Sequence, residues 1–392
     1  MAALTRARAL SLAGTALLAV AACSPAERPG AAPSPSPSGT PSGTPSSTGP
    51  TTPPTTPDVE PPPEPRPAPV TIAVAGDVHF EGVLRERLRD PATALAPATS
   101  ALAAADVAVV NLETSVGTGG RPDPAKRYTF QAPPTAFTAL AAAGVDVATM
   151  ANNHALDFGR EPLPGMLDAA ARARRADPPL DVVGLGRDAA AAFRPARTEV
   201  GGPGGTVVAT IGATVATLDP TADPTGSWAA TADAAGTADA VDPTRLLRAV
   251  ARADASADVV VAYLHWGVQG ERCPSPGQRS LAGDLVAAGA DVVVGSHAHR
   301  LQGDGRLGPG YVAYGLGNYA WYTQGPEATS STGVLTLAVR PPASPSGRAR
   351  VTEATWTPAR IGPDGLPAPL RAAEAAGFDA DRDALRDCAG LG

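Results

Sequence analysis

The chain has 392 residues, of which 43% are hydrophobic, and a formal net charge of −7 at pH 7. The hydrophobic share is ordinary for a soluble globular protein. The acidic balance argues against broad nucleic-acid binding, which needs a surface rich in lysine and arginine, and we expect no nucleic-acid partner. A small anionic substrate is not excluded, because a bound metal ion can reverse the sign of a pocket.

The first residues predict a secretory leader. Arg6 and Arg8 precede an apolar run, residues 9–22, that is too short for a comfortable transmembrane helix. The run ends directly before Cys23 in a sequence that resembles a bacterial lipobox. We therefore expect residues 1–22 to be a lipoprotein signal peptide. Cys23 would then carry a lipid that anchors the protein on the outer face of the bacterial cell membrane. The alternative is a plain cleaved signal peptide with an incidental cysteine.

Residues 23–69 are dense in proline, serine, threonine and glycine and contain almost nothing that could form a core. We expect a disordered, extended tether here, which would hold the folded part away from the membrane. The folded part is expected over residues 70–362, with residues 363–392 as a C-terminal tail that packs on it. The two remaining cysteines, Cys273 and Cys388, are expected to pair in an oxidising compartment; two free thiols are the alternative.

From residue 70 onward, short valine-rich runs alternate with stretches of helical composition. This alternation predicts an α/β domain with much parallel pairing, and the nearly continuous apolar runs predict strands buried on both faces. Two later runs, 333–339 and 350–357, have no helix between them and predict an antiparallel pair. The other expected strands cover residues 70–74, 106–110, 145–150, 181–183, 206–211, 258–264, 291–294 and 311–314. The expected helices cover residues 98–104, 136–143, 166–175, 243–253 and 278–288.

All five histidines of the chain follow predicted strands closely. In folds of this class, functional residues gather at the carboxyl ends of the strands. An Asp-x-His or His-x-His spacing in extended backbone directs both side chains to one face, so each pair offers two ligands to one centre. Imidazole, carboxylate and amide oxygen suit Mn, Fe or Zn, and the set is large enough for two divalent metal ions. The candidate ligands are Asp77, His79, Glu113, Asn153, His265, His297 and His299, with His154 beside them.

These residues lie in short sequence blocks that span residues 76–318. The blocks are Gly76-Asp77-Val78, Asn111-Leu112-Glu113, Ala151-Asn152-Asn153-His154 with Asp157 and Gly159, His265-Trp266-Gly267 and Leu316-Gly317-Asn318. The order of these blocks resembles that of the calcineurin-like metallophosphoesterase superfamily. The residues within the blocks are similar to those of the CapA family of poly-γ-glutamate capsule synthesis proteins. The resemblance implies an α/β four-layer sandwich, in which two mixed β-sheets are flanked by helices.

The resemblance also implies how the ligands divide. His154 would stay off the metals, as a general acid or as a donor to developing charge. The superfamily's usual bridging aspartate has no counterpart here, and Glu113 is the carboxylate available to bridge. Gln269 stands where the CapA pattern usually has glutamate, and Ala298 and Arg300 also depart from that pattern. The implied ligands are Asp77, His79 and His299 for one metal ion, and Asn153, His265 and His297 for the other.

Three further residues are candidates for contact with an anionic substrate. Lys126 and Arg127 follow the strand of Glu113 by a loop, and Asn318 follows another strand. A solvated loop is the alternative for the first two, and for Asn318 a position without contact to substrate.

The chemistry implied is metal-assisted hydrolysis or transfer at a phosphoryl or acyl centre. The resemblance implies a substrate at the cell surface, such as poly-γ-glutamate or another wall polymer. A second interpretation is a phosphodiesterase or phosphatase that acts on an extracytoplasmic phosphate ester. A third is a protein without catalytic activity that binds an anionic polymer through its metal ions.

Overall fold

The computed structural model of the protein describes residues 68–96, 98–322, 327–344 and 347–391. The predicted signal peptide, the predicted lipidation site Cys23 and the predicted tether up to residue 67 lie outside these described residues. Within them, no helix has the length and apolar character needed to cross a membrane.

The larger of the two main sheets is built around β1 (Val70–Val78), which is buried along nearly its whole length. A short strand, β15 (Asn318–Ala320), pairs in parallel with the last residues of β1. On one side of β1, three parallel strands follow in the order β2 (Val107–Leu112), β5 (Val147–Thr149) and β6 (Asp181–Val183). On the other side, three strands follow, each antiparallel to its neighbour: β16 (Ser331–Arg340), β17 (Arg350–Ile361) and β18 (Pro367–Pro369). The antiparallel pair predicted from residues 333–339 and 350–357 is thus confirmed.

The second sheet has β11 (Val259–Trp266) near its centre, and it too is mixed. Parallel neighbours are β9 (Thr206–Thr214) on one side and β12 (Val292–His297) followed by β14 (Gly310–Ala313) on the other. The two edges are antiparallel, with β8 (Ala196–Val200) beside β9 and β13 (Asp304–Leu307) beside β14.

Short ladders and helices connect these strands. The ladders are β3 (Ser115–Val116) with β4 (Gln131–Ala132) and β7 (Leu185–Gly186) with β10 (Gly236–Thr237). The 3-10 helices are η1 (Gly82–Arg89) and η2 (Ala216–Leu218). The α-helices are α1 (Ser100–Ala103), α2 (Thr135–Ala142), α3 (Leu163–Ala173), α4 (Ala189–Ala192), α5 (Thr244–Asp254), α6 (Pro276–Ala288), α7 (Glu327–Ser330) and α8 (Ala372–Ala389).

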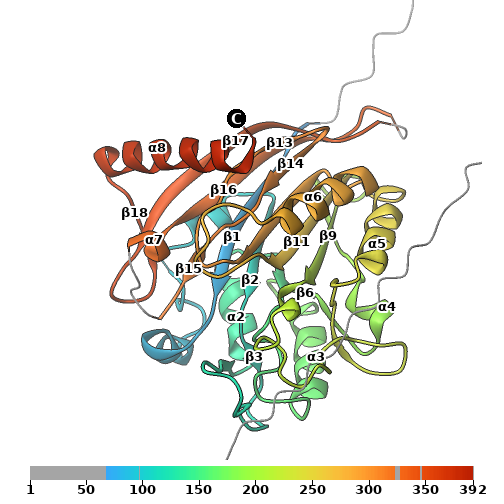
Figure 1. Ribbon diagram of the computed structural model, residues 1–392, viewed down its shortest axis with the longest axis vertical. Coiled ribbons are helices and arrows are strands. Elements are labelled where there is room, and N and C mark those ends of the chain that lie inside the picture. Colours follow the sequence, from blue (N-terminus) through green and yellow to red (C-terminus); the bar gives the residue numbers. More distant parts are fainter. Residues whose placement is uncertain (1–67, 97, 323–326, 345–346, 392) are drawn as a thin grey trace, which may run out of the picture. The chain divides into compact units, whose positions relative to one another are not determined.

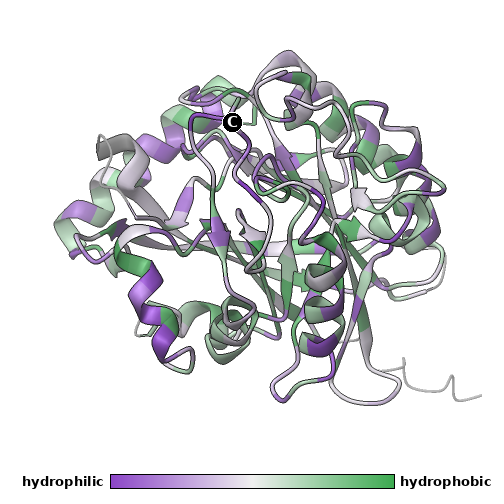
Figure 2. Cartoon of the chain, turned by 90° about the horizontal axis from the view of Figure 1, so that it is seen from below, coloured by the Kyte–Doolittle hydropathy of each residue, from purple (hydrophilic) through white to green (hydrophobic). Residues whose placement is uncertain are grey.

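The two sheets pack face to face. Ile72 and Val109 of the larger sheet belong to the same buried cluster as Val261 and Val294 of the second. The outer face of the larger sheet packs against α2 and α3, and the outer face of the second against α5 and α6 (Figure 1). Figure 2 shows hydrophobic residues concentrated on the strands, while the helices carry hydrophilic residues as well. The expected α/β four-layer sandwich with two mixed sheets is therefore confirmed.

The sequence around α6 shows why a helix begins and ends there. The Ser275 side chain accepts the backbone N–H of Gln278 (3.2 Å), and the Gln278 side chain accepts the backbone N–H of Ser275 (2.8 Å). This capping box, with Pro276 at the first helical position, satisfies N–H groups that the helix itself leaves unpaired. Gly289 ends the helix with φ at 119°, where glycine is favoured. The helix returns the chain from the end of β11 to the start of β12, so these parallel strands end at the same edge of the sheet.

The segment expected as a C-terminal tail supplies β18 and α8. Phe378 and Leu385 of α8 are buried in the cluster between the sheets, and the ring of Phe378 lies 5.6 Å from that of Trp356 on β17. Two arginines of the same helix, Arg382 and Arg386, bind the buried carboxylate of Asp304 on β13. These contacts hold α8 across β13 and β17.

A covalent link also joins α8 to the rest of the chain. Cys388, in the last turn of α8, forms a disulfide with Cys273, and their Cα atoms are 5.6 Å apart. Cys273 lies in the loop between β11 and α6. The disulfide therefore connects the end of the chain to the loop that follows His265.

Candidate metal centre

Strands of both sheets deliver polar side chains to one buried region. Asp77 ends β1, and the segments that follow β2 and β5 carry Glu113, Asn153 and His154. His265 lies near the end of β11, and β12 ends at His297. These strands are parallel within each sheet, so their carboxyl ends meet, as the sequence predicts. Of the described residues, two groups could each hold a metal ion: Glu113 with His265 and His297, and Glu113 with Asp77 and His299.

In the first group, lone-pair donors converge. Glu113 Oε1 lies 3.5 Å from Nε2 of His265, and this nitrogen lies 3.1 Å from Nδ1 of His297. The side-chain oxygen of Asn153 lies between the two rings, 2.5 Å from Nε2 of His265 and 3.2 Å from Nδ1 of His297. Carboxylate, amide oxygen and two imidazoles therefore share one small space, which is a ligand set suited to a divalent transition metal.

The second group is centred on Asp77. Its carboxylate lies 3.4 Å from Nδ1 of His299 and also accepts the side-chain amide of Asn111 (2.8 Å). Asn318 contacts the same ring nitrogen of His299 at 2.8 Å. Glu113 belongs to both groups, so it stands where a bridging carboxylate would stand.

The hydrogen bonding of the Glu113 carboxylate tests whether these residues fit a metal ion. The side chain is fully buried, and neither carboxylate oxygen has a hydrogen-bond partner among the described residues. Burial, followed by the negative charge of Asp77, raises the pKa of Glu113 well above its ordinary value. A buried carboxylate without a partner is strongly disfavoured, and a cation within reach would relieve it. The residues therefore fit a metal ion.

Electrostatics separate the two groups. Burial opposes ionisation of Asp77, but the hydrogen bond with His299 and the charges of His265 and His299 outweigh it and lower the pKa of Asp77 below its ordinary value. Burial likewise opposes protonation of His299, but the charges of Glu113 and Asp77 raise the pKa of His299 to about 9. Burial lowers the pKa of His265 to about 3 and that of His297 well below its ordinary value. A cation at Asp77 would therefore displace a proton from His299.

The backbone at the His-x-His segment departs from the extended form expected from its spacing. Among the described residues other than glycine, only His297 (φ 95°) and His299 (φ 54°) have positive φ angles. The two rings consequently do not join the same ligand group. His297 joins the group of His265, and His299 joins the group of Asp77.

His154 is held by a chain of polar contacts behind the metal groups. Its Nδ1 lies 2.6 Å from Oδ2 of Asp157, and its Nε2 lies 3.7 Å from Oε1 of Glu113. Burial lowers the pKa of His154 well below its ordinary value, so the ring is neutral. Burial raises the pKa of Asp157 to about 7, but the Lys126 ammonium beside it favours the carboxylate, which only accepts, so we assign the ring proton to Nδ1. Nε2 then faces the centre as a proton acceptor.

Lys126, the only lysine of the chain, has different partners from those expected. Its side chain is 4% exposed and forms an ion pair with Asp157 at 2.5 Å. The ammonium group also donates to the backbone oxygens of Asn153 and Ala222. It therefore holds Asp157, and through it His154, rather than facing solvent. The reason is that burial would leave Asp157 unpaired without a cation beside it.

The structure gives different surroundings to His79, Arg127 and Asn318, the three other candidates. His79 lies outside both groups: its Nδ1 accepts the backbone N–H of Glu81 (3.0 Å), and its Nε2 lies 3.4 Å from the backbone N–H nitrogen of Tyr322. Its role as a ligand stays a prediction. Arg127 is exposed, with its guanidinium 5.1 Å from the ring centre of Tyr128, and makes no contact with the centre. Asn318 lies at the site and orients His299.

Sequence reasoning gave no role to several residues that support the site. Asn152 donates to the side-chain oxygen of Asn111 (3.0 Å), and the side-chain nitrogen of Asn111 donates to Asp77 and lies close to Nδ1 of His265. The ring of Phe130 stacks between those of His79 and His154, at 4.9 and 4.2 Å. Asp157 had a usable signal, since it stands three residues after His154. Phe130 had none, because nothing local marks its contact with that ring.

Fold and site together define a four-layer α/β protein with a candidate metal centre at the carboxyl ends of its strands. The family model described as bacterial capsule synthesis protein PGA_cap matches residues 71–322. The chain belongs to this family, which confirms the resemblance to CapA proteins drawn from the sequence blocks.

Several curated proteins are similar to the chain. The capsule biosynthesis protein CapA of Bacillus anthracis is 33% identical over 210 residues, which cover 52% of this chain and 46% of the relative. The PGA biosynthesis protein CapA of Bacillus subtilis is 31% identical, with 55% of this chain and 53% of the relative covered. A probable polyglutamine synthesis accessory protein of Mycobacterium tuberculosis is 31% identical, with 50% of each chain covered. The chain thus spans about half the length of the curated relatives it matches.

Solved structures were also matched. One is a phosphatase of Mycoplasma pneumoniae, with 13% identity and a TM-score of 0.41 over 74% of this chain and 94% of the other. Another is the sulfate thiohydrolase SoxB of Thermus thermophilus, with 17% identity and a TM-score of 0.36 over 77% of this chain and 46% of the other.

Proposed function

We propose that this protein acts in poly-γ-glutamate or capsule polymer metabolism at the cell surface, through a centre of two divalent metal ions. Glu113 carries the proposal, because both of its oxygens are buried, have no hydrogen-bond partner among the described residues, and face both ligand groups. Membership of the PGA_cap family and the names of the relatives support the polymer. An extracytoplasmic location with a lipid on Cys23 is part of the proposal and rests on the leader sequence.

The geometry favours a particular ligand set. Mn, Fe and Zn are the metals that such a mixture of nitrogen and oxygen ligands suits. His79 is left out, because both of its ring nitrogens lie close to backbone N–H groups. Asp77, His299 and Glu113 would hold one ion, and Glu113, Asn153, His265 and His297 the other.

The reaction we propose is cleavage or transfer at an acyl or phosphoryl centre. When bound, a pair of divalent ions lowers the pKa of water and neutralises negative charge on the group under attack. His154 Nε2 faces this region and takes up the proton of the attacking water. Asp157 fixes the ring by holding Nδ1, and Lys126 fixes Asp157. The protonated ring then returns the proton to the leaving group, which is the acid role that the sequence resemblance implies.

The test is metal content and turnover of the full chain. Elemental analysis is expected to give about two transition-metal equivalents per chain, and fewer for His297→Ala. His79→Ala is the comparison: metal content equal to that of the wild type would leave His79 outside the centre, in keeping with the two groups, and a lower content would make it a ligand, as the resemblance implies. Shortening of poly-γ-glutamate, followed by gel filtration and abolished by a chelator, would support the activity. No specific metal after reconstitution would contradict the centre.

A substrate panel separates the other interpretations. Hydrolysis of generic phosphodiesters or phosphomonoesters, without action on polyglutamate, would favour the phosphoesterase. Polymer binding without turnover, unchanged in His154→Ala, would favour a binding protein.

A further inference from the structure

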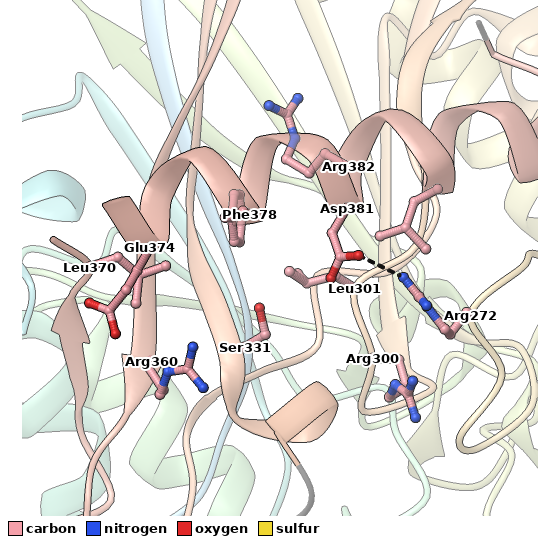
Figure 3. A pocket seen from close by; sticks show the side chains of 12 residues that line it. Arg272, Arg300, Leu301, Ser331, Arg360, Leu370, Glu374, Phe378, Asp381 and Arg382 are labelled. Carbon is pink, nitrogen blue, oxygen red and sulfur yellow. Dashed lines mark hydrogen bonds and ion pairs between the residues drawn. The ribbon is translucent and has the colours of Figure 1, made fainter. Parts of the chain in front are cut away.

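A cavity of about 600 Å³ lies between α8, the strands β16 and β17, and the segment that follows His299. This is the size range of pockets that bind small molecules or segments of a polymer. Figure 3 shows Arg300 and Arg360 on either side of Ser331, with α8 above them. Apolar side chains, including Leu301 and Phe378, form another part of the wall. The cavity therefore combines guanidinium groups with an apolar surface.

The arginines of the cavity wall differ in the ion pairs that they form within the protein. Arg382 is paired with the buried Asp304 and points away from the opening. Arg272 forms an ion pair with Asp381 (3.4 Å), and because both side chains are exposed, this pair contributes little to stability. The side chain of Arg300 has no hydrogen bond or ion pair with any described residue. At least one arginine of the wall is therefore available to an anion without breaking an internal contact.

Two carboxylates of α8, those of Glu374 and Asp381, also line the cavity. Asp381 is engaged by Arg272, as described above. Glu374 accepts the backbone N–H of Arg371 (3.2 Å) in the first turn of α8. Arginines and acidic groups thus share the wall, and among the described residues the Arg300 guanidinium pairs with neither carboxylate.

Some residues of the cavity wall are next to residues of the metal centre in the sequence. Arg300 directly follows His299, which lies beside Asp77. Two other residues of the cavity wall, Ser331 of β16 and Arg360 of β17, are paired with each other in the antiparallel register of these strands. Asn318, which contacts His299, also donates to the backbone oxygen of Thr329, two residues before Ser331. Residues of the cavity wall and ligands of the metal centre thus lie next to one another on the same segments of the chain.

We propose that this cavity is a subsite for the carboxylates of an anionic polymer whose reacting bond lies at the metal centre. The inference rests on the proposed function, since it assumes a polymer substrate. Guanidinium groups bind planar carboxylates in a two-point geometry, which makes arginine the preferred residue for them. A γ-linked glutamate chain also carries two methylene groups between successive amides, and these suit the wall formed by Leu301 and Phe378.

A second cavity supports this assignment by contrast. It has about 610 Å³ and reaches the other side of the centre through His297. Its wall includes the apolar side chains of Leu218, Val241 and Trp266 and contains no arginine or lysine. Carboxylates of a bound polymer are therefore expected on the arginine side of the centre.

The test is binding of a defined γ-linked glutamate decamer to the full-length chain, measured by isothermal titration calorimetry in the presence of a chelator. Arg300→Gln is expected to weaken binding about tenfold or more, because a hydrogen-bonded charge pair is lost. Arg272→Gln, as a second variant, should weaken it as well. Arg248→Gln is the matched control, since it removes the same charge from the exposed surface of α5, and should leave affinity unchanged. Thermal unfolding of each variant checks that it folds.

The outcomes are distinct from those that test the proposed function. Binding that depends on Arg300, without any cleavage of the polymer by the metal-loaded protein, would uphold the subsite and overturn the proposed reaction. Cleavage with equal decamer affinity in the wild type and in both cavity variants would overturn the subsite alone. Binding of inorganic phosphate that depends on Arg300, without binding of the decamer, would also overturn it. Loss of affinity in Arg248→Gln equal to that in Arg300→Gln would show only nonspecific charge attraction and would contradict the subsite.

Discussion

Glu113→Gln should change stability in opposite directions in the metal-free and the metal-loaded protein. The substitution keeps the size of the side chain and removes a carboxylate that is fully buried and has no hydrogen-bond partner among the described residues. In the metal-free protein, we expect the free energy of unfolding to stay equal or to rise. In the metal-loaded protein, we expect it to fall, because the shared ligand of both groups is lost.

The magnitudes follow from burial and from mass action. A buried polar group without a partner costs about 1–3 kcal/mol, and because the glutamine amide is also such a group, the gain of the metal-free variant should stay below this figure. Metal at about 100 times its dissociation constant should stabilise the wild type by about 2.7 kcal/mol. This stabilisation should shrink by about 1.4 kcal/mol for each tenfold loss of affinity in the variant.

Equilibrium urea unfolding of the full chain, with a chelator and with added metal, measures both quantities. Asp304→Asn is the matched control, because Asp304 is equally buried but is paired with Arg382 and Arg386 away from the centre. It should lose stability by the same amount in both conditions. If Glu113→Gln behaved like this control, the reasoning from the unpaired carboxylate would be refuted.

Three further outcomes are expected. His154→Ala should lower turnover about 10²–10⁴-fold while metal content, measured by elemental analysis, stays unchanged; loss of both would make His154 a structural residue. Gly76→Ala should destabilise the fold by about 1–3 kcal/mol or more in urea unfolding, because the new Cβ would lie 1.8 Å from the backbone oxygen of Gly317, whereas Gly165→Ala in α3 meets no atom within 4 Å and should be neutral or stabilising. Burial raises the pKa of Asp291 to about 6, so its contribution to stability is present below about pH 4 and is lost, by about 3 kcal/mol, as pH rises through 6. Asp291→Asn should remove this pH dependence from the unfolding free energy, and an unchanged pH profile would contradict it.

The central part of the fold could be predicted from the sequence because each central strand is a short, nearly continuous apolar run. Edge strands gave weaker signals. In β8 (Ala196–Val200), buried and more exposed residues alternate, and the sequence includes arginine and glutamate. The helix α8 was expected only as a tail, since it buries few side chains, chiefly Phe378 and Leu385. Its position depends on contacts with Trp356 and Asp304, which are distant in sequence and leave no local pattern.

The candidate site was predictable to the extent that its residues follow strands. Asp77, Glu113 and His265 come together because parallel strands end at one edge, and sequence spacing carries that information. The contacts between side chains within the site, in contrast, are not encoded in sequence spacing. Lys126 lies 31 residues from Asp157, and only the folded chain shows that the ion pair is buried. The ion pair of Lys126 with Asp157 therefore could not be predicted, and contact of Lys126 with substrate stays a prediction.

The backbone of one three-residue segment explains how the ligands divide between the two groups. In extended backbone, His297 and His299 would point to the same face and serve one metal ion. With positive φ angles at both residues, the ring centres lie 6.3 Å apart and each ring joins a different group. Such a conformation costs on the order of 1 kcal/mol or more per residue and persists only where neighbours hold it. Here the N–H of His297 donates to Asp77 (3.3 Å), and Asn318 binds the ring of His299. The strained segment is thus held by contacts with Asp77 and Asn318, and it places the two histidines in different ligand groups of one centre, whereas extended backbone would place them in the same group.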